Sequence, residues 1–104
     1  MHELFLQAIN EKRKIMVTFF SNEDGHSLKR LCAPFDYGPS NKYKDKSPRY
    51  HMYDYTSDSG SHVLSILPGQ LKEILLTDEY FNPLDLVTWN NPKWHVQRDW
   101  GIVS

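Results

Sequence analysis

The sequence has only one cysteine, which limits both disulfide and metal chemistry. Cys32 has no second cysteine to pair with, so an internal disulfide is excluded. Such cysteine usage is typical of a reducing compartment, and we expect a cytoplasmic protein. No C-x-x-C or H-x-x-x-H spacing occurs, so we predict no metal site. His51 and His62 could approach each other on neighbouring strands, but roles as surface or core histidines are favoured.

Long apolar runs and the motifs of common enzyme classes are also missing. No stretch approaches 18 apolar residues, so we expect no membrane-spanning segment. The N-terminal residues lack the basic and then apolar pattern of a signal peptide. Neither G-x-S-x-G nor the glycine patterns of dinucleotide and P-loop sites occur, so we predict neither an enzyme nor a cofactor. Cys32 is interpreted as a small buried apolar residue.

The sequence has no large excess of either charge sign. The net charge is −1, which argues against a protein devoted to nucleic acid. The charges are unevenly distributed, however. Residues 1–52 contain nine basic and six acidic side chains, whereas residues 53–104 contain three basic and seven acidic ones. Any surface that attracts anions is therefore expected to come mainly from the first half.

Apolar periodicity predicts one domain that contains a helix and five strands. The helix is expected over 2–13, and the strands over 15–21, 26–35, 49–55, 61–67 and 73–77. Gly25 is expected to adopt a positive φ in a turn, and Pro34 to mark an edge, a bulge or a strand end. Residues 70–81 fit a helix and a buried strand equally well, and we choose a turn at 70–72 followed by the strand. The fold class predicted is mostly β.

An antiparallel small barrel accommodates these elements, with residues 49–55 as its central strand. The short helix needs tertiary contacts for stability, so it is expected to cover the open end of the barrel. A helix that binds a partner is the less favoured alternative.

Candidate binding residues gather around the loop 36–48. This loop is rich in Gly and Pro, and it interleaves lysines with tyrosines, a composition that can contact phosphates and bases. A merely solvated loop remains the simpler interpretation. On the following strand, one alternating face is expected to form a polar and aromatic surface. The candidate ligand or nucleic-acid residues are Lys42, Tyr43, Lys44, Lys46, Arg49, His51 and Tyr53.

Residues 82–104 form a C-terminal extension that contains all three tryptophans. Alternation between positions 94 and 102 is typical of a strand. Three tryptophans are unusual in a disordered segment, so the extension is expected to pack on the barrel or on a partner. Trp94, Arg98 and Trp100 are the candidate interface residues, because Arg98 can stack on either ring. A homodimer formed through this extension is one expected arrangement.

The order of these features resembles the WYL domain of bacterial transcription regulators. The residues that carry the resemblance are Ala8-Ile9-Asn10-Glu11-Lys12-Arg13, the run 15–20, Gly25, Arg30, Pro34, Tyr50, Leu71 and Phe81. The resemblance covers about residues 8–81 and implies an Sm-like five-stranded small barrel with an N-terminal helix. The WYL-like unit is therefore assigned to 1–81. Because about 14 residues precede the first expected strand, we expect no upstream winged helix-turn-helix.

Two functions from different classes are consistent with the sequence. The resemblance implies a stand-alone regulatory module that senses single-stranded nucleic acid or a nucleotide-like ligand. The family's Trp-Tyr-Leu triplet stands here as Arg49-Tyr50-His51, and the expected strand 61–67 lacks the arginines with which family members bind such ligands. The alternative is a protein-interaction or oligomerisation module. The spacing of lysine and tyrosine favours the first function, whereas the near-neutral charge and the missing arginines favour the second.

Overall fold

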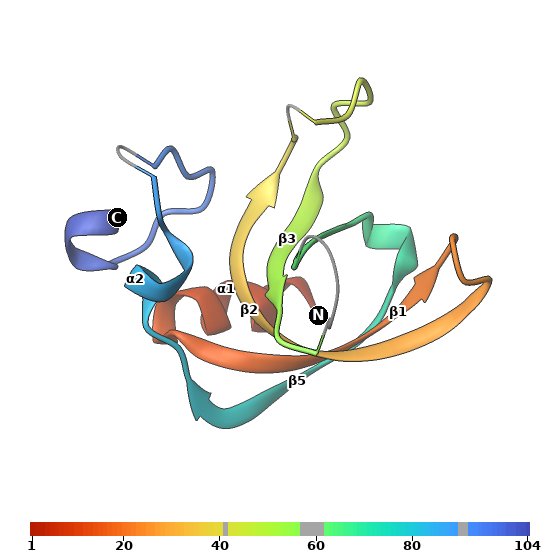
Figure 1. Ribbon diagram of the computed structural model, residues 1–104, viewed down its shortest axis with the longest axis horizontal. Helices are drawn as coiled ribbons and strands as arrows, with labels where there is room; N and C mark the ends of the chain where they lie inside the picture. Colours follow the sequence, from red (N-terminus) through yellow and green to blue (C-terminus); the bar gives the residue numbers. More distant parts are fainter. Residues whose placement is uncertain (41, 57–61, 90–91) are drawn as a thin grey trace.

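A computed structural model describes residues 1–40, 42–56, 62–89 and 92–104, and the fold is mostly β (Figure 1). The elements, in chain order, are α1 (His2–Glu11), β1 (Arg13–Ser21), β2 (His26–Gly38), β3 (Arg49–Asp54), β4 (Val63–Ile66), the 3₁₀ turn η1 (Pro68–Gln70), β5 (Leu71–Tyr80), the short helix α2 (Pro83–Leu86) and the 3₁₀ turn η2 (Gly101–Val103). An N-terminal helix followed by five strands agrees with the prediction.

The five strands form one antiparallel sheet in the order β4-β3-β2-β1-β5. The expected closed barrel is wrong, because β4 and β5 are the two edges and do not pair in the described part of the chain. A physical reason is the shortness of β4, which has four residues against ten in β5. Figure 1 shows β2 and β5 strongly curved, so the sheet bends without closing.

The middle strand of the sheet is β2, not the 49–55 segment. β2 runs through Pro34 and reaches Gly38, beyond the expected end at residue 35. Pro34 lies opposite Met52 and Asp36 opposite His51, so β2 carries one extra residue, Phe35, between these pairs. This irregularity confirms the bulge that Pro34 suggested. A bulge bends a strand and changes where its side chains point, and here Asp36 follows it directly.

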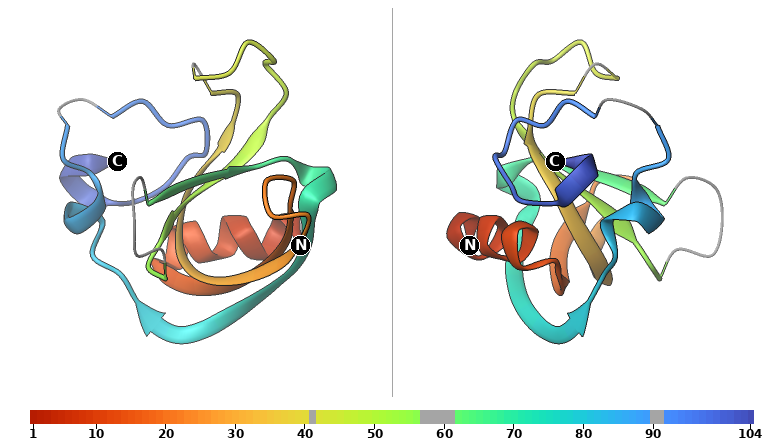
Figure 2. Two further views of the ribbon diagram at one scale, coloured as in Figure 1. Left: turned by 45° about the vertical axis from the view of Figure 1, so that its right-hand side comes forward. Right: turned by 90° about the vertical axis from the view of Figure 1, so that its left-hand side faces the viewer.

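Helix α1 ends two residues earlier than expected. Lys12 adopts the left-handed conformation (φ 58°) that closes helices, and β1 starts at Arg13. Phe5, Ala8 and Ile9 form the buried stripe of the helix and pack against β1, β2 and β5. The helix is docked, as expected, but it packs on the open sheet and not over the end of a closed barrel (Figure 2).

The ambiguous segment after Pro68 is a strand, but with bounds wider than expected. The turn lies at Pro68–Gln70, and β5 extends to Tyr80 rather than residue 77. The Gln70 side chain fixes this corner, because its oxygen accepts from the Leu67 N–H (3.0 Å) and its amide donates to the Phe20 carbonyl (3.1 Å). Gly25 has a φ of 73°, which confirms its expected role in the β1–β2 turn.

The expected strand in the C-terminal extension is wrong. Among its described residues, 82–89 and 92–104, only α2 and η2 are regular. Figures 1 and 2 show the extension beside β2, on the side of the molecule away from the β1–β2 hairpin. Within the described ranges, no helix is long and apolar enough to cross a membrane.

Removing side-chain volume from Ile9 tests the docking of α1. Ile9 is fully buried, so Ile9→Ala should lower the free energy of unfolding by about 2–5 kcal/mol, measured by urea denaturation. Glu3→Ala, an exposed change on the same helix, is the matched control and should have little effect. Equal stability of the two variants would show that α1 is not part of the core.

Candidate functional site

Asp36 fixes the C-terminal extension to the end of β2. Its carboxylate accepts hydrogen bonds from the backbone N–H groups of His95 (3.1 Å to each oxygen) and Val96 (2.9 Å). It also pairs with the Arg98 guanidinium at 3.2 Å. All of these partners are about 60 residues away in the chain, so one short side chain joins two distant segments.

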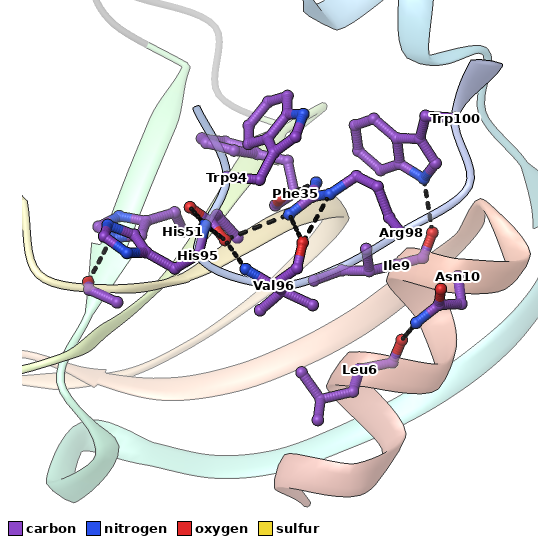
Figure 3. Close-up of polar contacts among 12 residues, drawn as sticks. Leu6, Ile9, Asn10, Phe35, His51, Trp94, His95, Val96, Arg98 and Trp100 are labelled. Carbon is purple, nitrogen blue, oxygen red and sulfur yellow. Dashed lines mark hydrogen bonds and ion pairs between the residues drawn. The ribbon is translucent and has the colours of Figure 1, made fainter. Parts of the chain in front are cut away.

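Arg98 packs against two tryptophan rings of the extension, which also contact each other edge-to-face (Figure 3). Its guanidinium carbon is 4.1 Å from the centre of the Trp94 ring and 4.5 Å from that of Trp100. The same group donates to the Val96 carbonyl through Nε (3.0 Å) and Nη2 (2.9 Å), and to the Phe35 carbonyl. A buried charge is tolerated only when it is paired and hydrogen-bonded in this way.

Burial and pairing act in opposite directions on the ionisation of Arg98. The side chain is 1% exposed, and this burial lowers the pKa of Arg98 to about 10, although the Asp36 carboxylate opposes the shift. The guanidinium therefore stays protonated at neutral pH. Its charge and that of Asp36 offset each other inside the protein.

Trp100 connects the extension to helix α1. It is buried, its indole N–H donates to the Ile9 carbonyl at 2.8 Å, and its ring meets the Phe81 ring edge-to-face. The Trp94 indole N–H donates to the Val103 carbonyl, also at 2.8 Å. The candidate interface residues Trp94, Arg98 and Trp100 thus contact their own chain, where they form one aromatic cluster.

Gly38 allows the closest approach between β2 and the extension. A Cβ atom added at Gly38 would lie 2.5 Å from the His95 ring, well inside van der Waals contact. The residue must therefore be glycine for the His95 ring to keep this position. Glycine is common where another segment passes close to a strand backbone.

The extension, the 39–48 loop and the β3–β4 pair surround a groove of about 500 Å³. We call it the loop–extension groove. Its lining combines aromatic, cationic and hydroxyl side chains, which come from all three walls. The lining residues are Phe35, Asp36, Pro39, Ser40, Lys42, Tyr43, His51, Val63, Ser65, Trp89, Lys93, Trp94 and His95.

The groove presents cationic groups without an uncompensated carboxylate among the lining residues. Lys42 and Lys93 are exposed and come from two different segments, the loop and the extension. Asp36 is the acidic lining residue, and Arg98 neutralises its charge. Trp89 is 49% exposed and meets Trp94 edge-to-face, with ring centres 5.9 Å apart. The local charge is therefore positive although the chain has a net charge of −1.

His51 is held at the floor of the groove by both ring nitrogens. Nε2 lies 2.8 Å from the Gly38 carbonyl, and Nδ1 lies 2.8 Å from the Ser65 hydroxyl. A carbonyl oxygen can only accept, so Nε2 carries a hydrogen, and in that tautomer Nδ1 accepts from the Ser65 hydroxyl. The residue is buried, so it belongs to a fixed floor rather than to the open polar surface expected from its strand position.

The other candidate ligand residues are divided between several places. Arg49 lies behind Tyr43, with its guanidinium 3.9 Å from the ring centre, and so supports a lining residue. Lys44 and Lys46 are exposed on the same loop but are not lining residues. Tyr53 is not a lining residue of the groove; it contacts the Tyr55 and His62 rings and lines a small adjoining pocket that shares Trp89 and Trp94 with the groove. Of the seven candidates, only Lys42, Tyr43 and His51 line the groove.

Several lining residues were not among the sequence-based candidates. They are Phe35, Asp36, Pro39, Ser40, Val63, Ser65, Trp89, Lys93 and His95. Nothing in their local spacing indicated a shared site, because they come from three distant segments. The tryptophan density of the extension was the available signal, but it suggested an interface rather than a groove wall.

Two other chemistries receive no support from the described residues. Within ranges 1–40, 42–56, 62–89 and 92–104, no group of three or more His, Cys, Asp or Glu side chains could hold a metal ion. Cys32 is fully buried, as expected, and burial together with nearby Asp54 raises the pKa of its thiol. A thiol in this state is a poor nucleophile.

Breaking the buried ion pair should show how strongly it stabilises the protein. We expect Asp36→Asn and Arg98→Met each to cost about 3–5 kcal/mol of unfolding free energy, because each leaves a buried partner unpaired. The double variant should lose less than the sum of the single losses. Glu79→Gln, which removes the exposed Lys14–Glu79 pair, is the control. Additive losses in the double variant would mean that the two side chains do not interact.

The chain was also compared with known proteins. No family model, no curated protein and no solved structure matches it. The functional argument therefore depends on the groove and on the residues that line it.

Proposed function

We propose that the protein is a WYL-like regulatory binding module, and that the loop–extension groove takes single-stranded nucleic acid or a nucleotide-like ligand. One observation carries this proposal. The groove joins Lys42, Tyr43 and His51 with the aromatic and cationic side chains of Trp89 and Lys93. Segments with no local relationship thus contribute the two kinds of group that a nucleotide needs.

The chemistry of the lining matches both parts of a nucleotide. A base has two aromatic faces and stacks on tryptophan or tyrosine, with a gain of about 1–3 kcal/mol per base. A phosphate pairs with lysine, and the hydroxyl of Ser40 can donate to its oxygens. Binding of the base and the phosphate in this way does not require the arginines that WYL family members carry on the strand corresponding to 61–67.

The chain order of the WYL-like features supports a regulatory role. The helix, the first strand, the glycine turn and the Pro34 strand follow one another in α1, β1 and β2, with β5 last. We propose an Sm-like arrangement in which the sheet stays open and the C-terminal extension covers part of it. The extension then supplies one groove wall.

Replacing the two groove lysines tests the proposal. A fluorescent oligothymidylate should bind the wild type weakly, with an affinity that falls as salt rises. Each phosphate contact contributes about 0.7 to the magnitude of the slope of log K against log salt concentration. Replacing both Lys42 and Lys93 by alanine removes two contacts, so this slope should become shallower by about 1.4. Fluorescence anisotropy across a salt series measures both quantities.

Two control variants separate the groove from general electrostatics. Lys29→Ala with Lys72→Ala removes two exposed lysines elsewhere and should leave the slope nearly unchanged. Lys44→Ala with Lys46→Ala removes two lysines from the same loop but not from the lining, and should have a smaller effect than the groove pair. Undetectable binding at low salt, or equal effects of all three pairs, would contradict a nucleic-acid groove.

A protein-interaction module remains the second candidate, because one apolar surface is exposed. Ile102 is 90% exposed and Leu84 53% exposed. Both lie at a second groove of about 540 Å³, which Phe81, Pro83 and Trp100 also line. Exposed apolar side chains beside a groove are typical of an interaction site.

The interaction function predicts a concentration-dependent dimer that a charge at this surface disrupts. Ile102→Glu should then shift the sedimenting species from dimer to monomer, because it buries a carboxylate in the interface. Thr88→Glu, at another exposed position of the extension, should leave the dimer intact. If the wild-type protein sediments as a monomer at every concentration, self-association through this surface is excluded.

A further inference from the structure

We infer that the ligand of the loop–extension groove is a single nucleotide unit with a terminal phosphate, not an internal stretch of a strand. This inference rests on the proposed function and specifies its ligand. A free mononucleotide and the 5′-phosphorylated end of a strand share this chemistry. Three features of the groove support it: its size, its one exposed aromatic platform, and its two cations from different segments.

The size of the groove suits one small ligand. Its volume of about 500 Å³ falls within the roughly 300–1,000 Å³ that small-molecule sites occupy. Its walls come from the 39–48 loop, the β3–β4 pair and the extension, so it is surrounded on several sides. A ligand of one nucleotide unit falls within this range of sizes.

The aromatic side chains offer one well-exposed tryptophan. Trp89 is 49% exposed, whereas Arg98 lies over the Trp94 ring at 4.1 Å and Trp100 is 4% exposed. Tyr43 has the Arg49 guanidinium stacked on it at 3.9 Å. Proteins that bind continuous single strands stack successive bases on successive rings. A single exposed platform therefore favours a single base.

The charges of the groove suit a phosphomonoester better than a phosphodiester. A terminal phosphate carries about −1.5 to −2 charges at neutral pH, whereas an internal diester carries one. Lys42 and Lys93 reach the groove from two walls, and Arg98 neutralises the Asp36 carboxylate. Two lysines can thus compensate a terminal phosphate, and the exposed His95 and the Ser40 hydroxyl add hydrogen-bonding groups.

Four matched probes test this inference: thymidine, thymidine 5′-monophosphate, and a short oligothymidylate with either a 5′-hydroxyl or a 5′-phosphate. Binding is followed by tryptophan fluorescence and by calorimetry. We expect the two probes with a terminal phosphate to bind about tenfold more tightly than their unphosphorylated counterparts. The Lys42→Ala, Lys93→Ala variant should lose this preference for a terminal phosphate. Trp89→Leu should weaken the binding of all probes that contain a base. The Lys29→Ala, Lys72→Ala control should keep both the phosphate preference and the affinity for the base.

The outcomes separate this inference from the proposed function. Equal binding of the two oligothymidylates would overturn the inference and leave a nucleic-acid groove in place. Inorganic phosphate that binds as tightly as thymidine 5′-monophosphate would also overturn it, because no base would be recognised. Absence of binding by every probe at low salt would overturn the proposed function itself. If both phosphorylated probes bind, the tighter one identifies whether the source is a free nucleotide or a strand end.

Discussion

The carboxylate of Asp36 is the constraint on which the arrangement of the C-terminal extension depends. The side chain is 8% exposed, and it accepts from two backbone N–H groups of the extension while it pairs with Arg98. An unpaired carboxylate at this depth would be costly, so the extension and the carboxylate need each other. The bulge at Pro34, by adding one residue to β2, places Asp36 where it can make these bonds.

The position of the extension in turn determines the groove. Phe35 and Asp36 belong to β2 and the loop follows that strand, whereas Trp89, Lys93 and His95 belong to the extension. If the extension left β2, the groove would lose one wall and one of its two lysines. Gly38 is part of the same junction, because its carbonyl accepts from His51 and its missing Cβ makes room for His95. The contacts that hold the extension on β2 are therefore the same contacts that form the groove.

Sequence patterns predicted the helix and the strands well, because the conformation of each depends mainly on neighbouring residues. The helical stripe, the strand runs, the Gly25 turn and the Pro34 bulge each depend on residues close in the chain. Barrel closure failed as a prediction because it depends on the pairing of β4 with β5, which no local pattern encodes. The alternation in the extension was misleading, since Trp94 and Trp100 pack against Arg98 rather than along a strand.

The candidate site was predicted in part for the same reason. Lys42, Tyr43 and His51 lie near one another in sequence, and the loop and β3 bring them to one groove. Tyr53 shares their pattern, yet it lies against Tyr55 and His62. Trp89 and Lys93 could not be assigned, because their place depends on a bond between residues about 60 positions apart. The function of Arg98 was likewise ambiguous until its partner was known.

Amide hydrogen exchange at His95 and Val96 tests the central claim most directly. Both N–H groups bond to the Asp36 carboxylate, although neither residue lies in a helix or a strand. If Asp36 holds the extension on β2, these two amides should exchange as slowly as amides within the sheet. Exchange at the rate of an unstructured peptide would contradict the account, because the extension would then leave β2 and the groove would lose its wall.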